Sequence, residues 1–201
     1  MKLQHKVALI TGTSPNIGSG IAIGLADAGA QVVCVDVQPD NAQRCADAIT
    51  QRCGAALGVV CDVTNEAHVQ AAVARAREVF GGVDILVNGA VIFNEKGVLD
   101  MPLAEWTQQL AVILTGTFLC TKYVAQLMID QGRQGSSINL ISTAGHQGEP
   151  WNIGYCTGKS GLLKCRLQKC RLQSITTDAA CPQSGRASVA YGSMRAKPRW
   201  L

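Results

Sequence analysis

Residues 6–20 read KVALITGTSPNIGSG, and this stretch decides the fold. Its beginning, residues 6–10, is a short apolar run typical of a buried strand. A glycine-rich turn follows, and apolar residues then recur at helical spacing until Gly29, which favours the end of a helix. A strand, a glycine turn and a helix in this order gather backbone N–H groups at a helix N-terminus, where a phosphate can bind. The stretch therefore predicts a nucleotide-binding unit.

A second strand is predicted for QVVCVD, residues 31–36, and it ends at Asp36. Asp36 follows Gly18 by 18 residues, close to the spacing at which an acidic residue binds the adenine ribose in dinucleotide-binding folds. A carboxylate repels a 2′-phosphate, and no Arg or Lys occupies positions 13–14 or 37–38. The sequence thus favours NAD over NADP as the cofactor. The alternative for Asp36 is a solvated strand end.

Further apolar runs alternate with helical patterns along the chain. Three more strands are predicted at 56–63, 83–90 and 136–142, with helices at 41–52, 66–80 and 103–131. This alternation indicates an α/β fold with a doubly wound parallel sheet covered on both faces. Ligands of such sheets bind beyond the carboxyl ends of the strands. The residues predicted at those ends are Gly12, Asp36, Asp62, Asn88 and Ser142, which predicts one composite site.

The segment YCTGK places Tyr155 and Lys159 four residues apart, and Ser142 lies 13 residues before Tyr155. Residues four apart on a helix share one face, so the phenol and the ammonium group can point at the same spot. The positive charge stabilises the phenolate, which suits general acid and base catalysis near neutral pH. A serine hydroxyl nearby can hydrogen-bond the oxygen of a carbonyl or an alcohol. The alternative is a chance pattern on an amphipathic helix.

Taken together, these motifs resemble the short-chain dehydrogenase/reductase family from about Lys6 to Leu163. The matching pieces, in order, are TGTSPNIG (11–18), Asp36, CDV (61–63), DILVNGA (84–90), LTGTF (114–118), Ser142 and YCTGK (155–159). The resemblance implies a Rossmann-type fold and NAD(P)-dependent oxidoreduction of a small-molecule alcohol or carbonyl compound.

The resemblance also implies roles for single residues. Tyr155 would be the general acid and base, Ser142 would orient the substrate oxygen, and Lys159 would support Tyr155 and bind the nicotinamide ribose. Asp62 would contact adenine, and Asn88 would lie beside the cofactor. The full predicted cofactor set is Gly12, Asn16, Ile17, Gly18, Asp36, Asp62, Val63, Asn88, Tyr155 and Lys159.

Three positions depart from the family pattern. Asn16 stands where the family has a glycine, a mild change because Asn tolerates a left-handed backbone better than most residues. Val91 adds a β-branched side chain where the family keeps a glycine near the cofactor. Ile113 replaces an Asn that joins the family's proton relay, and an isoleucine cannot hydrogen-bond a relay water. These departures bear on turnover more than on the fold.

The pattern breaks after Leu163. KCRLQ occurs twice in tandem, at 164–168 and 169–173, and no strand alternation follows. Residues 1–163 have a net charge of −3, whereas residues 164–201 have a net charge of +7. We therefore expect a Rossmann domain at 1–163 whose C-terminal strands are missing, and a basic, disordered tail at 164–201 of foreign origin. A nucleic-acid-binding arm is the alternative for this tail.

The overall composition limits the remaining possibilities. The nine cysteines show no C-x-x-C pair, so we expect reduced thiols and no metal site. The N-terminus has no signal-peptide pattern, and the apolar run at 110–120 is too short to span a bilayer. We expect a cytoplasmic homo-oligomer that binds no membrane.

Two functions stay open at this point. The first is an NAD(H)-dependent oxidoreductase that interconverts an alcohol and a ketone or aldehyde. The alternative is an inactive, truncated nucleotide-binding remnant that acts through binding or assembly. Ile113, Val91 and the altered C-terminal part favour the alternative, whereas the combined motifs favour the enzyme.

Overall fold

A computed structural model describes residues 2–165. The five strands of these residues form one parallel sheet in the order β3-β2-β1-β4-β5. Their bounds are β1 Val7–Thr11, β2 Gln31–Asp36, β3 Ala56–Val60, β4 Ile85–Asn88 and β5 Ser136–Asn139. Along the chain, the sheet grows outward from β1 to β3, continues with β4 on the other side of β1, and is completed by β5. The point between β1 and β4 is the topological switch point, where such sheets bind ligands.

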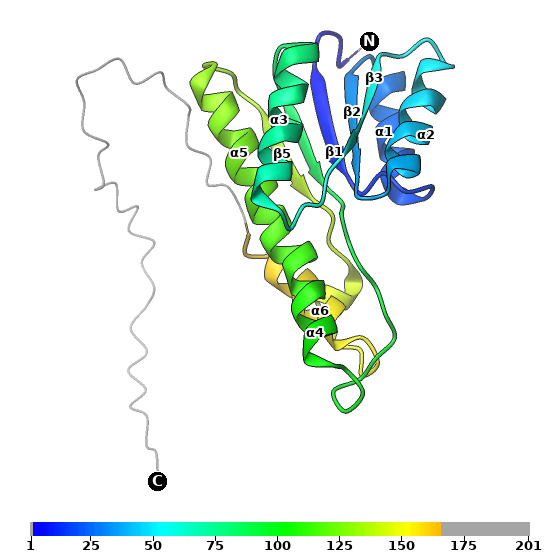
Figure 1. Cartoon of the computed structure of the whole chain (residues 1–201), viewed down its shortest axis with the longest axis vertical. Helices are drawn as coiled ribbons and strands as arrows, with labels where there is room; N and C mark the ends of the chain where they lie inside the picture. The colour runs from blue at the N-terminus through cyan, green and yellow to red at the C-terminus, as the bar shows by residue number, and fades with distance from the viewer. Residues whose placement is uncertain (1, 166–201) are drawn as a thin grey trace, which may run out of the picture.

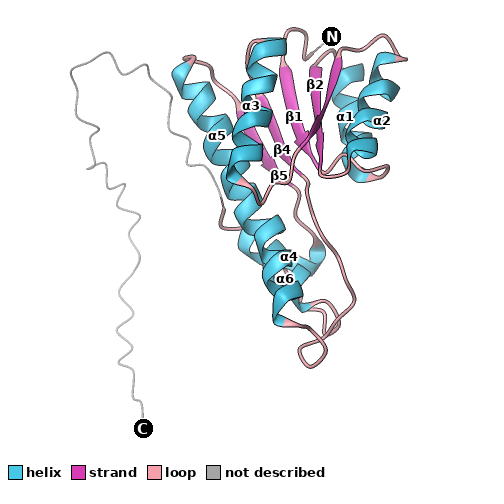
Figure 2. Ribbon diagram, viewed as in Figure 1, coloured by secondary structure: helices cyan, strands magenta, loops and turns pink. Residues whose placement is uncertain are grey.

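Helices cover both faces of the sheet (Figures 1 and 2). Helices α1 (Ile17–Asp27) and α2 (Pro39–Thr50) lie on one face, and α3 (Glu66–Phe80) and α5 (Gly116–Asp130) lie on the other. Helices α4 (Leu103–Leu110) and α6 (Ile153–Leu162) lie beyond the carboxyl ends of the strands. A π-helical turn, η1 (Ala111–Thr115), joins α4 to α5, and a 3₁₀ turn, η2 (Thr143–Gly145), precedes α6. The predicted Rossmann-type α/β fold is confirmed.

The alternation of side chains along β1 explains the two layers. Val7 and Leu9 pack with residues of α3 and α5, whereas Ala8 and Ile10 pack with residues of α1 and α2. All four are buried because successive side chains of a strand point to opposite faces. Apolar residues therefore fill both sides of the strand, which is why this stretch reads as a continuous apolar run.

Several predicted boundaries were wrong by a few residues. The third strand ends at Val60 and the fifth at Asn139, so Asp62 and Ser142 lie in the loops that follow. The fifth strand stops where its neighbour β4 stops, since Asn139 pairs with Asn88. The predicted helix at 66–80 is confirmed, because Asn65 caps its start and Gly81 adopts a left-handed conformation at its end. Gly29, with φ +103°, follows the end of α1 as predicted.

The helical stretch Leu103–Asp130 is 28 residues long and has a mean hydropathy of 1.5 in its most apolar window. In length and composition it is the one stretch among the described residues that meets the requirements of a membrane span. The same criteria are met by core helices, and here the α5 part packs on the sheet through buried residues such as Leu119, Val124 and Leu127. Of the predicted tail at 164–201, residues 166–201 lie outside the described residues.

Candidate functional site

The glycine turn after β1 is built around two close backbone approaches. Gly12 has φ +76°, and a Cβ atom there would lie 2.8 Å from the Cα of Ala90. A Cβ on Gly18 would lie 1.8 Å from the carbonyl oxygen of Gly12. Only glycine fits either position, so the first turn of α1 lies directly against the end of β1. This is the backbone geometry that a dinucleotide-binding turn requires.

The turn is also fastened to the end of β4. The hydroxyl of Thr11 accepts hydrogen bonds from the backbone N–H groups of Gly89 (3.1 Å) and Ala90 (3.2 Å). Asn16 stands at the N-cap of α1 but makes no side-chain capping hydrogen bond, which leaves the helix N-terminus open to a ligand. Asn16 has φ −153°, so the left-handed conformation considered for it is not adopted. Ile17, at the start of α1, is 72% exposed.

Asp36 ends β2 and lines a cavity of about 380 Å³ beside this turn. Its carboxylate is largely buried, and its Oδ1 atom accepts hydrogen bonds from the backbone N–H of Gln38 (2.9 Å) and the side-chain amide of Asn41 (3.3 Å). These bonds fix the carboxylate toward the cavity, and Oδ2 makes no hydrogen bond within residues 2–165. The alternative of a solvated strand end therefore does not describe Asp36. Asn41 on α2 also lines this cavity, but it belongs to no recognisable sequence motif and was not predicted as a site residue.

Asp62 and Val63 line the same cavity from the loop after β3. One carboxylate oxygen of Asp62 accepts hydrogen bonds from the backbone N–H (2.9 Å) and the hydroxyl (2.7 Å) of Thr64, which fixes the side chain in a tight turn. Val63 packs against Gly116, where a Cβ would come within 2.6 Å of its methyl group. The structure thus brings Gly12, Asp36, Asp62 and Val63 to one cavity, whereas Asn88 and Ser142, which were expected in the same composite site, do not line it.

Asn88 lies apart from that cavity surface. Its side chain is buried, and its amide donates hydrogen bonds to Thr121 (3.1 Å) and Asn139 (3.0 Å). These bonds tie β4 to α5 and β5. Its neighbours Gly89, Ala90 and Val91 line the cavity instead, with Val91 44% exposed. Asn88 therefore supports the wall of the site through the packing of three elements.

Helix α6 carries the predicted reactive pair on one face. The Nζ atom of Lys159 lies 5.6 Å from the centroid of the Tyr155 ring, and it donates a 2.6 Å hydrogen bond to the carbonyl of Leu140. Lys159 is buried, and this burial lowers the pKa of its ammonium group below the ordinary value of lysine. The Tyr155 ring is half-buried and also contacts Phe93 in a T-shaped arrangement, with centroids 5.3 Å apart.

Ser142 lies in the loop between β5 and α6, at the start of η2. Its hydroxyl accepts a hydrogen bond from the backbone N–H of Ala144 (3.2 Å). The η2 turn is locked onto α6, because Ser160 donates to the carbonyl of Gly145 and a Cβ on Gly145 would clash with Lys159. Ser142 and Lys159 are therefore held in one packed unit, although Ser142 and Tyr155 share no hydrogen bond among the described residues.

Ile113 occupies the middle of the π-helical turn η1 and is fully buried. A Cβ on Gly158 would come within 2.9 Å of its side chain, so α6 packs directly on Ile113. π-Helical turns occur often at functional sites. At this position the chain supplies apolar packing where the resemblance led us to look for a polar relay group.

Comparisons with known proteins agree with this geometry. The family model of short chain dehydrogenases matches residues 6–183, a range that extends past Leu163, where sequence analysis placed the end of the resemblance. The chain is 38% identical over 186 residues to 3-oxoacyl-[acyl-carrier-protein] reductase FabG of Aquifex aeolicus, covering 90% of this chain and 75% of the relative. It is 35% identical to D-threitol dehydrogenase of Mycolicibacterium smegmatis, covering 81% of this chain and 62% of the relative.

A solved structure of an NAD⁺-bound xylitol dehydrogenase superposes with a TM-score of 0.78. It is 31% identical in sequence, and the superposition covers 82% of this chain and 64% of that one. The chain therefore spans three quarters of the length of the Aquifex reductase but less than two thirds of the length of the threitol and xylitol dehydrogenases.

Proposed function

Because the chain belongs to the short-chain dehydrogenase/reductase family, we propose that it is an oxidoreductase that interconverts an alcohol and a ketone or aldehyde with NAD(H). The observation that carries this proposal is the pairing of Tyr155 and Lys159 on one face of α6, beyond the carboxyl ends of the strands. A phenol can act as a general acid or base toward the oxygen of a bound alcohol or carbonyl group.

The residues present fit a dinucleotide. Gly12 and Gly18 permit two close backbone approaches at the turn that a Cβ at either position would prevent, and the N-terminus of α1 is not capped by a side chain. A pyrophosphate suits such a helix end because the exposed N–H groups and the helix dipole favour negative charge. Asp36 presents a carboxylate oxygen to the cavity that can accept from a ribose hydroxyl. NAD(H), when bound, supplies or accepts the hydride.

We assign the remaining steps to residues of this chain. In the direction of reduction, Tyr155 donates its phenolic proton to the substrate oxygen as the carbonyl becomes an alcohol. Ser142 holds that oxygen by a hydrogen bond, and the ammonium group of Lys159 stabilises the phenolate that remains. In the direction of oxidation the same groups act in reverse, with Tyr155 as the base.

The preference for NAD over NADP follows from Asp36. A 2′-phosphate would place negative charge beside a largely buried carboxylate whose second oxygen makes no hydrogen bond within residues 2–165. The closest basic side chain on the following helix, Arg44, is exposed and pairs with Asp40 at 3.4 Å. The substrate class we propose is small polyols and hydroxy ketones, since relatives are named for threitol, galactitol and xylitol.

A second candidate function is nucleotide binding without turnover. The observation that favours it is Ile113, which is fully buried against Gly158 and offers no polar side chain to a proton relay. Both candidates bind NADH, and they differ only in turnover.

The test is turnover by the full chain with NAD⁺ and a panel of threitol, galactitol and xylitol, and with NADH and a 3-oxoacyl thioester. We expect Tyr155→Phe to reduce turnover by about 10²–10⁴-fold while NADH affinity is retained. Tyr123→Phe is the matched control, because Tyr123 is a tyrosine on α5 whose hydroxyl bonds the exposed Glu66. Equal turnover in Tyr155→Phe and wild type would refute the assignment, and NADH binding without any turnover would establish the second candidate.

A further inference from the structure

One contact of Tyr155 is not accounted for by the family resemblance. The Phe93 ring meets the Tyr155 ring with centroids 5.3 Å apart and planes at 82°. This edge-to-face arrangement is the one that aromatic pairs prefer. The Tyr155 ring also faces the Nζ atom of Lys159, which lies 5.6 Å from the ring centroid. Among residues 2–165 no hydrogen bond fixes the Tyr155 hydroxyl, so packing contacts of the ring, among them those with Phe93 and Lys159, must restrain its position.

Phe93 belongs to the long connection between β4 and α4, yet the residues after it are firmly attached. Asn94 accepts a 2.5 Å hydrogen bond from the buried Gln109 and donates a 2.6 Å bond to Glu105. Lys96 forms a 2.5 Å ion pair with the same Glu105. Both carboxylate oxygens of Glu105 thus hold residues 94–96 on α4, which restricts where Phe93 can lie.

The same segment is attached to the first turn of α6, next to Tyr155. The backbone N–H of Ile153 donates to the carbonyl of Lys96 at 3.4 Å. The side-chain oxygen of Gln109 is packed so closely against Gly154 that a Cβ there would lie 2.0 Å from it. Residues 93–96 therefore contact α6 directly and through Gln109, within two residues of Tyr155 on either path.

We propose that Phe93 is a positioning residue that holds the Tyr155 ring against Lys159 for proton transfer, an inference that rests on the proposed function. Phe93 is 54% exposed, so its ring contributes little to the core. The role assigned to it is to limit the rotation of the Tyr155 side chain. A connection of irregular structure between β4 and α4 thereby becomes part of the site.

The experiment compares Phe93→Leu, which removes the aromatic ring but keeps a large apolar side chain, with Phe93→Tyr, which keeps the ring. Phe118→Leu is the control, since Phe118 on α5 is also 54% exposed and forms no aromatic ring pair with Tyr155 within residues 2–165. We expect Phe93→Leu to lower kcat by about two- to twelvefold, the range that one aromatic contact supports, with NADH affinity and melting temperature unchanged. The solvent deuterium isotope effect on kcat should rise, because proton transfer becomes slower.

A readout that needs no turnover separates this proposal from the proposed function. With protonated tyrosine rings and ¹³C-labelled lysine in a deuterated full chain, wild type should show through-space NMR contacts between Tyr155 and Lys159. These contacts should weaken in Phe93→Leu and persist in Phe93→Tyr and Phe118→Leu. If the contacts weaken in Phe93→Leu but the wild-type chain shows no turnover, the positioning role is supported and the proposed enzymatic function is refuted. Unchanged contacts in Phe93→Leu would overturn the positioning role, whatever the activity.

Discussion

At the scale of single residues, the glycines of the first turn show how much one atom decides. Gly18 has no room for a Cβ, whereas Gly20, two residues further along α1, has no heavy atom within 4 Å of the position a Cβ would take. Both look alike in the sequence TGTSPNIGSG. The sequence could predict a dinucleotide turn, but only the packing of the Gly12 carbonyl distinguishes the required glycine from the replaceable one.

We expect Gly18→Ala to lower the free energy of unfolding by about 1–3 kcal/mol and to abolish NADH binding, since the turn or the helix must move. Gly20→Ala should be neutral or stabilise the chain by up to about 1 kcal/mol, because alanine favours helix more than glycine. Urea denaturation and NADH fluorescence titration measure both effects. Wild-type affinity in Gly18→Ala would contradict this account of the turn.

The second prediction at this scale concerns Asp36. Wild type should bind NADH more tightly than NADPH by about 1–3 kcal/mol, the usual cost of a polar mismatch. Asp36→Asn keeps the shape but removes the charge, so the gap between the two cofactors should narrow. Asp40→Asn, which neutralises an exposed carboxylate on α2, should leave the gap unchanged. Fluorescence titrations with both cofactors decide the matter, and a wild type that prefers NADPH would exclude the assignment of NAD.

At the scale of elements, the sequence predicted those helices and strands whose positions depend on a local pattern of residues. The helix at 66–80 was placed correctly from its helical pattern of apolar residues, and in the structure Asn65 caps its start and Gly81 its end. The fifth strand was predicted too long, since its apolar run continues to Ile141 while its pairing ends at Asn139. The π-helical turn at Ala111–Thr115, against which Gly158 of α6 packs, carries no recognisable signal in the sequence. The contact of Phe93 with Tyr155 was missed for the same reason.

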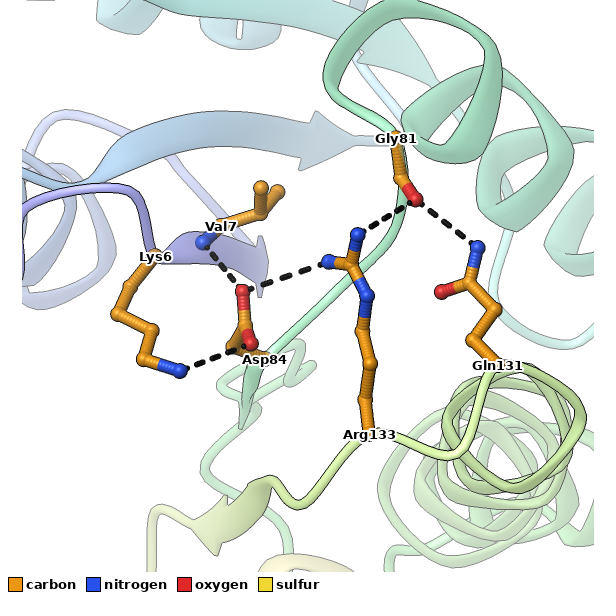
Figure 3. A network of polar contacts seen from close by, with 6 residues as sticks. All are labelled: Lys6, Val7, Gly81, Asp84, Gln131 and Arg133. Atoms are coloured by element: carbon orange, nitrogen blue, oxygen red, sulfur yellow. Dashed lines mark hydrogen bonds and ion pairs between the residues drawn. The ribbon is translucent and has the colours of Figure 1, made fainter.

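A polar network joins several elements at the amino ends of the strands, away from the candidate site (Figure 3). The buried carboxylate of Asp84 accepts from the backbone N–H of Val7 at 2.9 Å and pairs with Lys6 at 3.2 Å and Arg133 at 3.7 Å. Arg133 and Gln131 also donate to the carbonyl of Gly81, just past the end of α3. The network thus fixes the starts of β1 and β4 relative to α3 and the turn before β5.

We expect Asp84→Ala to lower the free energy of unfolding by about 1–3 kcal/mol, because the N–H of Val7 loses its partner inside the fold. Lys6→Met should cost less than about 1 kcal/mol, since Lys6 is half-exposed and exposed ion pairs contribute little. NADH affinity should be retained in both variants, because this network lies at the amino ends of the strands. Denaturation curves that give both variants the same free energy of unfolding would contradict the central role of Asp84.

At the scale of the whole molecule, the edges of the sheet bear on association with other chains. Within residues 2–165, β3 and β5 are the outer strands, and each pairs with one neighbour. Ile138 in β5 and Ile141 just after it are 46% and 48% exposed. An outer strand with exposed apolar side chains offers backbone N–H and C=O groups to another chain. The predicted homo-oligomer and cytoplasmic location stay predictions, and β5 is the element at which association can be tested.

We therefore expect Ile138→Lys to reduce self-association of the full chain. A lysine on an outer strand disfavours pairing, because joining two such strands would bring like charges together. Val79→Lys is the matched control, since Val79 is 41% exposed but lies on helix α3, which has no free strand edge. Size-exclusion chromatography with light scattering, over a range of concentrations, measures the fraction of larger species. If β5 mediates association, that fraction falls in Ile138→Lys alone, whereas an equal fall in both variants would mean that added charge, and not the strand edge, is responsible.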